Sequence, residues 1–566
     1  MLRRVLGSSP RVRAAAAFAA YCAVSFAYFG SWVVAHPAGR TIGRSTDANV
    51  FVWGFAWWPH ALWHGENPIF THAIWAPSGL DLAWAVSSPG LSFAFAPLTL
   101  LAGPVASYNV AAMLMPALAA WTAFLLCRYL TRAFWPSLAG GYLFGFSSWM
   151  LGQQADSHLH MVAAFLLPLV ALVFLQYLDR RIGRRALAIR LGLLLAAQFS
   201  IATELFATLA VAGAVGLALA WALVPTVRTR LLSALAPIAA AYALAAVLVS
   251  PLLYYILTDF RKGVFFPPGD NSADLLNLIV PTKETAIGGA AASGISAHFA
   301  SNEFEQGAYL GLPTLAIVAL FLLRRRGHPA GRFLGVSLGV ALIAALGTAL
   351  HIDGHQLVPL PWWPLARTPL LNKVYPSRLI VYATLAAAVA VALWAASRDA
   401  PRWLRVALPA LAVLALVPHL DAHRWDRTPK VPAFFADRLD KVCLAPGEND
   451  LVIPYSFLGD ALLWQARSGF SFRLAGGDFG SGFIPPEFAG TTVIRLLHDH
   501  GHPDDGRNIL AFARSKGVST ILLDPTDPWP WQPILAGIEP PKKEVGGMLL
   551  YPIGPGLVTD AACVAN

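Results

Sequence analysis

The chain has 566 residues, of which 57% are hydrophobic and only 13% are charged. An ordinary soluble domain carries about 25% charged residues, so this composition excludes that class and predicts an integral membrane protein. The net charge of +10 does not indicate a nucleic-acid partner, because much of the Lys and Arg stands in short clusters between apolar runs, as expected for cytoplasmic loops.

The first apolar run, Ala14–Ala35, follows a basic segment, Met1–Arg13, that has four arginines and no acid. A cleaved signal peptide is the alternative interpretation. The run is long for a signal peptide, however, and no clear small-residue cleavage site follows it. We therefore expect an uncleaved first span with the N-terminus in the cytoplasm.

An aromatic segment, Arg40–Asp81, comes next. We predict a helix in it that begins at Asp47 and ends before Gly65. Ser45 and Thr46 are its candidate N-caps. Aromatic side chains favour the headgroup layer, so we expect the helix to lie at the membrane surface and to hold Asp47 there. The alternative is that Asp47 is an ordinary helix-end acid favoured by the helix dipole. The aromatic residues of the helix are Phe51, Trp53, Phe55, Trp57, Trp58 and Trp63.

Further spans are indicated by apolar runs of roughly 20 residues and by basic clusters that fall on one side at every turn. The segment Ser88–Gly103 is apolar but short, and it contains Pro89 and Pro97, so we expect it to be re-entrant or interfacial. The pattern predicts about eleven spans, with the N-terminus inside and the C-terminus outside. The predicted spans after the first are Val105–Cys127, Phe134–Leu151, Met161–Leu178, Ala186–Ala202, Leu205–Val224, Leu232–Leu257, Ala308–Leu323, Phe333–Leu350, Leu379–Ala396 and Trp403–Leu420.

Two domains follow from this pattern. Residues 1–420 are predicted to form an all-α polytopic membrane domain with a first outer loop of residues 36–104, and residues 421–566 a small α/β domain outside the membrane. Cys443 and Cys563 lie near the two ends of the second domain. They are a candidate disulfide pair in an oxidising compartment, and two unpaired thiols are the alternative.

The turn after the second of these later spans carries the sequence QQADSHLH, with Asp156, His158 and His160. One interpretation is metal ligation, since Asp and His suit several divalent ions. A His-x-His pair without further ligands is weak evidence for a metal. Other interpretations are hydrogen bonds to a phosphate or to substrate hydroxyls, or a polar turn at the interface. We predict that the turn binds substrate, and a divalent metal stays a candidate cofactor.

Charged residues elsewhere on the predicted outer side are further candidates for substrate binding. Glu204 stands between two apolar runs, so we expect it to face a polar cavity or to be a turn residue. Lys262 and Arg378 lie in large outer loops, against the topology rule. Phosphate binding explains them, because Arg offers forked donors and Lys a point charge. Lipid headgroups and ordinary loop charge are the alternatives. Arg44, just before Asp47, is also expected to bind substrate.

The runs that carry a family resemblance are DANVFVWGFAWWPHAL, NPIF, APSGLDLAW, YNVAAMLMPALAAWTAFLLCRYL and SHLHMVAAFLLPL. They are similar to the GT-C class of bacterial membrane glycosyltransferases, which use polyprenyl-phosphate sugars, and the likeness covers most of the spans. The first-loop acid of that class maps to Asp47. In the class this acid is the catalytic base, or in some members helps to bind a metal. Here a single Asp stands at this position rather than an adjacent acidic pair.

The resemblance implies transfer of a sugar from a polyprenyl-phosphate donor to a glycan, lipid or protein acceptor at the periplasmic face of the bacterial inner membrane. Two alternatives remain. A non-catalytic transporter of lipid or polysaccharide should carry polar or broken helices at mid-membrane, whereas here the polar residues gather at the outer edge. An O-antigen-ligase-like transferase would work mainly through outer arginines, and would not need the first-loop acid or the large C-terminal domain.

Overall fold

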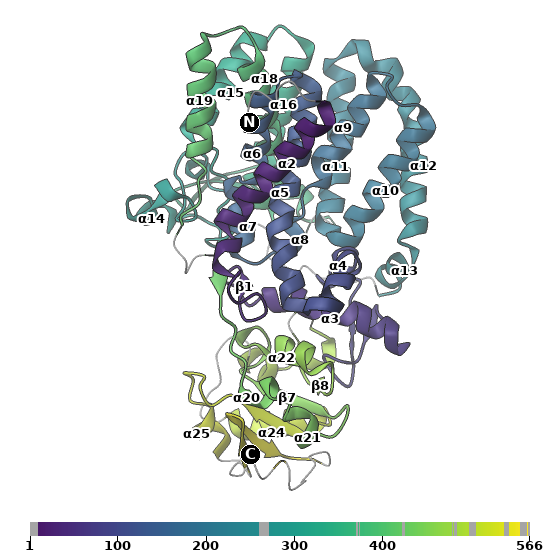
Figure 1. Ribbon diagram of the computed structural model, residues 1–566, viewed down its shortest axis with the longest axis vertical. Helices are drawn as coiled ribbons and strands as arrows, with labels where there is room; N and C mark the ends of the chain where they lie inside the picture. The colour runs from purple at the N-terminus through teal and green to yellow at the C-terminus, as the bar shows by residue number, and fades with distance from the viewer. Residues whose placement is uncertain are drawn as a thin grey trace.

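The computed structural model describes residues 9–259, 271–368, 372, 374–420, 425–477, 479, 484–496, 505–536, 543–554 and 563. The helices of a bundle stand side by side in the upper part of Figure 1, helix α3 crosses beneath them, and a β-sheet with its own helices lies at the lower end, where the chain finishes. The bundle therefore lies on one side of α3, and the sheet lies on the other.

The bundle consists of apolar helices whose backbone donors and acceptors are satisfied within each helix, as a bilayer requires. Its helices are α2 (Pro10–Tyr28), α4 (Pro89–Ala102), α5 (Pro104–Thr131), α6 (Phe134–Gly145), α7 (Ser148–Ala155), α8 (Leu159–Val162), α9 (Leu166–Leu178), α10 (Arg184–Ile201), α11 (Thr203–Leu223), α12 (Arg228–Leu248), α13 (Ser250–Thr258), α15 (Leu312–Arg325), α16 (Pro329–Ala345), α18 (Ile380–Ala396) and α19 (Arg402–Leu414).

Among the described residues, five helical segments are long and apolar enough to cross a membrane. This confirms the prediction of a membrane protein, whereas the count of about eleven spans stays a prediction. The five segments are Pro104–Thr131, Leu159–Leu178, Thr203–Leu223, Pro225–Leu248 and Pro376–Ala396.

Three predicted spans are each divided into two helices, one of them Met161–Leu178, which is shared by α8 and α9. The run Phe134–Leu151 is split into α6 and α7 at Ser147, whose side chain caps α7 by accepting a hydrogen bond from the Met150 N–H. The run Leu232–Leu257 is split into α12 and α13, with Pro251 at the start of α13, where proline is tolerated. Helix α4 has 14 residues, about 21 Å at 1.5 Å per residue, which suits the short segment expected there.

Helix α3 (Ala48–His64) carries the aromatic residues of the first loop, and their surroundings differ from the prediction. Phe51 and Phe55 pack into the core of the bundle, and Trp53, Trp57 and Trp58 pack into the core of the sheet region. These five rings are buried in protein and not exposed to the headgroup layer as expected, whereas the position of the helix relative to the membrane stays a prediction. Only Trp63 is exposed among the six. The helix is thus a shared core element of the two regions.

Residues from 425 onward, called here the C-terminal unit, contain a five-stranded sheet with the order β10-β11-β9-β7-β8. Strand β7 is parallel to both β8 and β9, and the remaining pairs are antiparallel. Cys443 and Cys563 are joined by a disulfide with their Cα atoms 5.2 Å apart. The elements of the unit are β6 (Asp426–Arg427), α20 (Ala433–Ala436), α21 (Asp440–Cys443), β7 (Asn449–Ile453), α22 (Ala461–Ser468), β8 (Arg473–Leu474), α23 (Thr491–Ile494), α24 (Asp505–Ser515), β9 (Thr520–Leu523), α25 (Trp531–Ala536), β10 (Lys543–Val545) and β11 (Met548–Pro552).

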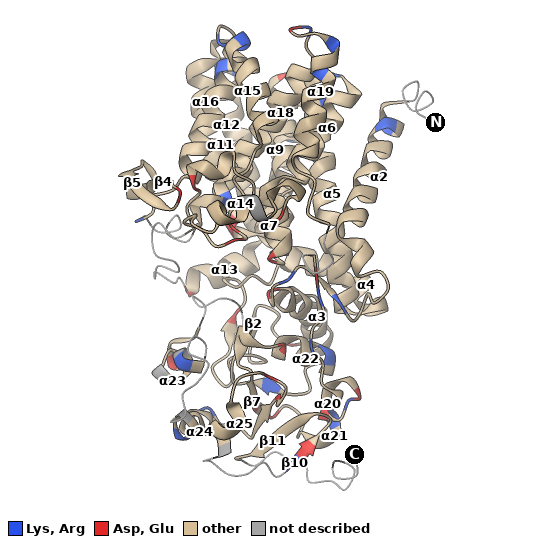
Figure 2. Ribbon diagram, turned by 90° about the vertical axis from the view of Figure 1, so that its left-hand side faces the viewer, with Lys and Arg blue, Asp and Glu red and all other residues tan. Residues whose placement is uncertain are grey.

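Short elements connect the bundle to this unit and cover the end of the bundle. Strand β1 pairs antiparallel with β6, so the first loop and the C-terminal unit share a small sheet. The acidic residues near the middle of Figure 2 lie at the end of the bundle that faces the C-terminal unit, while Lys and Arg gather at the opposite end of the bundle. The short elements are β1 (Thr41–Ile42), β2 (Phe70–Thr71), β3 (Leu80–Asp81), α14 (Ala290–Ser296), β4 (Ala349–Ile352), β5 (His355–Pro359) and α17 (Trp362–Leu365).

Candidate functional site

The loop before α3 packs directly on the turn between α7 and α8. The Arg44 N–H donates to the Ala155 carbonyl over 2.8 Å, and the Ser157 hydroxyl donates to the Ser45 carbonyl over 3.4 Å. Gly43 has φ +93°, and a Cβ on it would lie 2.1 Å from the Ser157 Oγ, so only glycine fits there. These contacts hold the two segments together and place Asp47 next to the QQADSHLH turn.

His158 is the centre of the resulting cluster. Its Nε2 lies 3.0 Å from Asp47 Oδ2 and 3.3 Å from Asp156 Oδ2. Its Nδ1 lies 2.9 Å from Gln153 Oε1. The other end of that amide, Nε2, donates to Glu305, so Oε1 must be the acceptor. Both imidazole nitrogens therefore face acceptors, which requires a proton on each and makes His158 an imidazolium.

The charges around His158 agree with this protonation state. Burial disfavours the imidazolium, but Asp156 and the hydrogen bond to Asp47 outweigh burial and raise the pKa of His158 to about 9. Burial raises the pKa of Asp156 to about 6, with Asp47 and Glu305 adding to the shift and His158 opposing it. At neutral pH the cluster thus holds a protonated His158 beside an ionised Asp156.

Asp47 stands at the N-cap position of α3, yet its side chain makes no capping bond to that helix. The carboxylate is turned to His158 instead, and it is 38% exposed. A helix-end acid that only capped its helix would accept from the first backbone N–H groups. Asp47 is therefore an accessible carboxylate held from one side.

A second network adjoins the first and contains Glu305, which the sequence did not single out. Arg378 Nε and Nη2 donate to Glu305 Oε1 over 2.8 and 2.6 Å, and Nη1 donates to Glu204 Oε2 over 2.6 Å. The Glu305 segment approaches α7 closely at Gly152, where a Cβ would lie 2.3 Å from the Phe304 carbonyl oxygen. Three predicted site residues, Glu204, Arg378 and His158, are thus joined through Glu305 and Gln153.

The remaining predicted residues fall beside or outside these networks. Arg44 donates to Glu284 over 2.6 Å, contacts Glu303 at 3.4 Å, and lies 4.9 Å from the centre of the Phe304 ring. The ring of His160 stacks 5.6 Å from that of Phe51. Lys262 lies outside the described residues.

Three atoms of these predicted residues are buried without a hydrogen-bond partner in the described part of the chain. They are Arg44 Nε, His160 Nδ1 and Glu204 Oε1. Buried polar atoms in native proteins are nearly always hydrogen-bonded, so each unpartnered atom needs an explanation. A bound substrate is one.

The residues described by the structure contain no group of three or more His, Cys, Asp or Glu side chains that could hold a metal ion. The nearest arrangement is Asp47, Asp156 and His158. There the imidazole Nε2 that would ligate a metal carries a proton, which it donates to Asp47, and it lies 3.3 Å from Asp156, the other carboxylate that would be a co-ligand. As arranged, these residues do not fit a metal.

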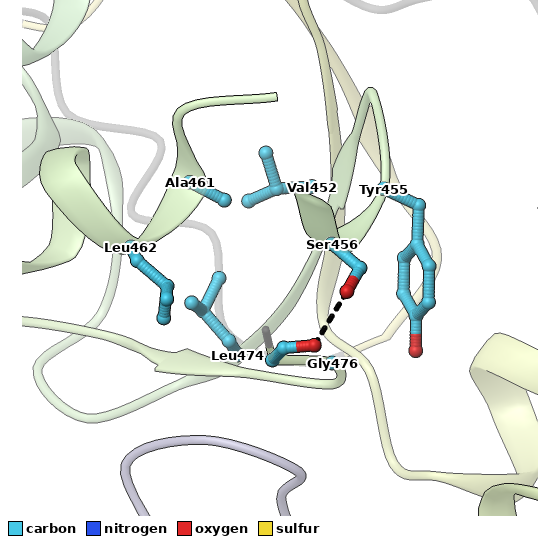
Figure 3. Close-up of a pocket in the computed structure, with 8 residues that line it drawn as sticks. Val452, Tyr455, Ser456, Ala461, Leu462, Leu474 and Gly476 are labelled. Carbon is cyan, nitrogen blue, oxygen red and sulfur yellow. Dashed lines mark hydrogen bonds between the residues drawn. The ribbon is translucent and has the colours of Figure 1, made fainter. Parts of the chain in front are cut away.

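A small pocket lies in the C-terminal unit, and none of the predicted site residues lines it. It lies next to the C-terminal ends of β7 and β8. The Ser456 hydroxyl donates to the Gly477 carbonyl over 2.5 Å, which is the dashed line in Figure 3. Its lining is mainly apolar, with the residues Val452, Tyr455, Ser456, Ala461, Leu462, Leu474, Gly476 and Gly477. Because the Ser456 hydroxyl of this pocket is already bonded to Gly477, we place the candidate functional site at Asp47 and not in the pocket.

Solved structures with a similar fold include membrane glycosyltransferases. The arabinofuranosyltransferase AftD from Mycobacteria aligns with a TM-score of 0.54 and 16% identity over 97% of this chain, which spans only 40% of the AftD chain. The Archaeoglobus fulgidus oligosaccharyltransferase, in complex with Zn and sulfate, aligns with a TM-score of 0.54 and 12% identity over 90% of this chain and 68% of its own. At such identities the likeness establishes the fold, which is that of the GT-C class, and confirms the class predicted from the sequence.

No curated protein sequence matches the chain. The chain belongs to the family described as a domain of unknown function, DUF6311, whose model matches residues 18–423. The match covers the bundle from the middle of α2 onward, α3 and the whole of the cluster around His158.

Proposed function

We propose that the chain is a glycosyltransferase that moves a sugar from a polyprenyl-phosphate donor to a glycan, lipid or protein acceptor, with Asp47 as the base. The observation that carries the proposal is the Asp47 carboxylate, which is 38% exposed and bonded to His158 over 3.0 Å. A carboxylate so placed can accept a proton on its free side.

The acceptor hydroxyl oxygen attacks the anomeric carbon, its proton goes to Asp47, and the bond from that carbon to the donor phosphate oxygen breaks. The leaving polyprenyl phosphate takes the electron pair. A transition state with oxocarbenium-like character is stabilised by a nearby carboxylate, and Asp156 supplies a second one beside His158.

The unpartnered atoms suggest which residues bind the donor. Arg44 has an Nε–H without an acceptor in the described part of the chain, so we assign it to the leaving phosphate. His160 Nδ1 and Glu204 Oε1 suit sugar hydroxyls, which can donate and accept. All three kinds of guanidinium nitrogen of Arg378 already donate to carboxylates. Its expected phosphate contact, like that of Lys262, stays a prediction.

The site belongs, in this proposal, to the periplasmic face of the bacterial inner membrane. The N-terminus lies in the cytoplasm, the membrane domain comprises residues 1–420, and residues 421–566 are periplasmic. Two observations support this orientation. The basic end of the bundle lies away from α3 (Figure 2), at whose N-terminal end Asp47 stands, and the Cys443–Cys563 disulfide belongs in an oxidising compartment.

The position of the charged residues favours an enzyme over a transporter. Glu204 lies in the first turn of α11 and Arg378 immediately precedes α18, so both stand at helix ends rather than at mid-membrane. A transporter site is expected near the midplane, at broken helices. An O-antigen-ligase-like transferase would rely on free arginines, whereas Arg378 is bonded to two carboxylates.

The test is transfer by the full-length purified chain in nanodiscs. Radiolabelled polyprenyl-phosphate pentoses and hexoses are offered together with cell-envelope glycan acceptors, and both labelled product and released polyprenyl phosphate are measured. Asp47→Asn should abolish transfer while the chain stays folded. The matched control is Asp353→Asn, which changes an exposed carboxylate that also pairs with an imidazole, His298, at 3.1 Å. Full turnover in Asp47→Asn would overturn the mechanism.

A further inference from the structure

A single nitrogen occupies the space between two carboxylates at the proposed site. His158 Nε2 donates to Asp47 Oδ2 over 3.0 Å and lies 3.3 Å from Asp156 Oδ2 as an ion-pair contact, so one nitrogen faces two acids. Two ionised carboxylates that both approach one nitrogen would, without its charge, repel each other and any approaching phosphate. The space between two such acids is where a divalent cation would otherwise bind.

The opposite side of the imidazole fixes its orientation. His158 Nδ1 donates to Gln153 Oε1 over 2.9 Å, while Gln153 Nε2 donates to Glu305 over 3.1 Å. Glu305 is fixed in turn by Arg378. The ring therefore cannot turn its Nε2 away from the carboxylates without breaking a buried chain of hydrogen bonds. With both nitrogens protonated, His158 has no lone pair to offer a metal.

We propose that the imidazolium of His158 is the built-in cation of this site and takes the place of a divalent metal between Asp47 and Asp156. Its role in catalysis rests on the proposed function, while its occupancy of the site does not. His158 is a positioning residue that acts through Asp47. It cancels one carboxylate charge so that the donor phosphate can approach, and it holds Oδ2 of Asp47 so that Oδ1 meets the acceptor hydroxyl.

The first test needs no activity. Mn²⁺ is titrated against the purified full-length chain and followed by electron paramagnetic resonance. The unaltered chain should show no saturable Mn²⁺ site that depends on Asp47. His158→Asp replaces the cation with a third carboxylate and should create one such site, which Asp47→Asn should remove again. Saturable Mn²⁺ binding by the unaltered chain that is lost in Asp47→Asn would overturn the proposal.

The second test uses the transfer assay after treatment with EDTA. The unaltered chain should keep its rate. His158→Gln keeps a hydrogen-bond donor but removes the charge, and should lower kcat by about 10²–10³-fold, the usual effect of removing one preorganised electrostatic contact, with no recovery on adding Mg²⁺ or Mn²⁺. His158→Asp should regain transfer only with a divalent ion.

The two ideas fail in different ways. Transfer by the unaltered chain that stops with EDTA and returns with metal would overturn the role of His158 and leave the glycosyltransferase function standing. An absence of transfer from every donor, with Mn²⁺ binding confined to His158→Asp, would overturn the proposed function and support the built-in cation. A melting curve for each variant shows that the loss is not one of folding.

Discussion

His158 Nε2 lies 3.0 Å from Asp47 Oδ2 although the two residues are 111 positions apart in the chain. The contact joins the first outer loop to the turn that follows α7. As a result Asp47, an acid at the end of a helix, is held by the cationic side chain of His158. Each neighbouring contact that positions these two groups gives a separate prediction.

The first prediction concerns pH. Transfer should be constant between pH values of about 6 and about 9, the pKa values of Asp156 and His158. Below that range Asp156 gains a proton, and above it His158 loses the charge that faces Asp47, Asp156 and Glu305. The measurement is kcat/KM against pH in nanodiscs. His158→Gln should lack the alkaline limb, and an alkaline limb that persists in this variant would contradict the assignment.

The sign of the stability effect follows from the same shifts. The pKa of His158 is raised in the folded chain, so its contribution to stability is complete below the unfolded value of about 6.5 and is lost as the pH rises through about 9. The pKa of Asp156 is also raised, so folding favours its protonated form, and that contribution is lost as the pH rises through about 6. Melting temperatures at a series of pH values measure both.

Gly43→Ala should damage the site without touching a charged residue. The position has φ +93°, and a Cβ would lie 2.1 Å from Ser157 Oγ. The left-handed conformation alone costs about 1–2 kcal/mol for a residue with a Cβ, and relief of the clash should move Asp47 away from His158. We expect a lower melting temperature and a fall in kcat. Gly39→Ala is the control, because its Cβ would be 3.7 Å from the nearest atom. Equal effects of the two substitutions would contradict the prediction.

Arg378→Met should destabilise the chain strongly, because it leaves Glu204 and Glu305 buried without their partner. Loss of one member of a buried ion pair costs about 3–5 kcal/mol. Arg325→Met is the matched control, because Arg325 pairs with Asp399 at 3.2 Å on the surface, where a pair contributes about 0–1 kcal/mol. Unfolding in detergent measures both variants. A similar small loss in each would mean that the Arg378 network is not a structural one.

Local patterns in the sequence were enough to find much of this site. Apolar runs and basic clusters predicted a membrane protein, and the resemblance of several runs to the GT-C class implied its fold. The isolated acid at Asp47 and the turn around His158 were visible as polar residues next to apolar runs. Glu305 could not be found in this way. It lies in a long loop beside Glu303, and only the approach of that loop to Gly152 makes one of the two acids a buried partner of Arg378.

The surroundings of α3 were predicted wrongly for a related reason. Tryptophans at a membrane face suggest a headgroup-layer helix, and nothing local shows that the C-terminal unit, hundreds of residues later, covers them. In the structure Trp53 Nε1 donates to Gln465 Oε1 over 2.7 Å, and Asn49 Nδ2 donates to Asp460 Oδ1 over 2.8 Å. Burial of these rings depends on contacts that are distant in sequence.

The last prediction tests whether this covering unit also positions the base. Gln465→Leu removes the acceptor of Trp53 and leaves a buried N–H unsatisfied, at a cost of about 1–3 kcal/mol. Because Trp53 and Asp47 belong to the same helical segment, we expect kcat to fall more than KM changes. Trp53→Phe removes the donor, so the double variant should be less damaged than the sum of the two single ones. Trp57→Phe, whose Nε1 donates instead to the Pro68 carbonyl over 3.0 Å, is the control and should be additive with Gln465→Leu. Additivity for Trp53 as well would mean that the contact contributes nothing to the placement of Asp47.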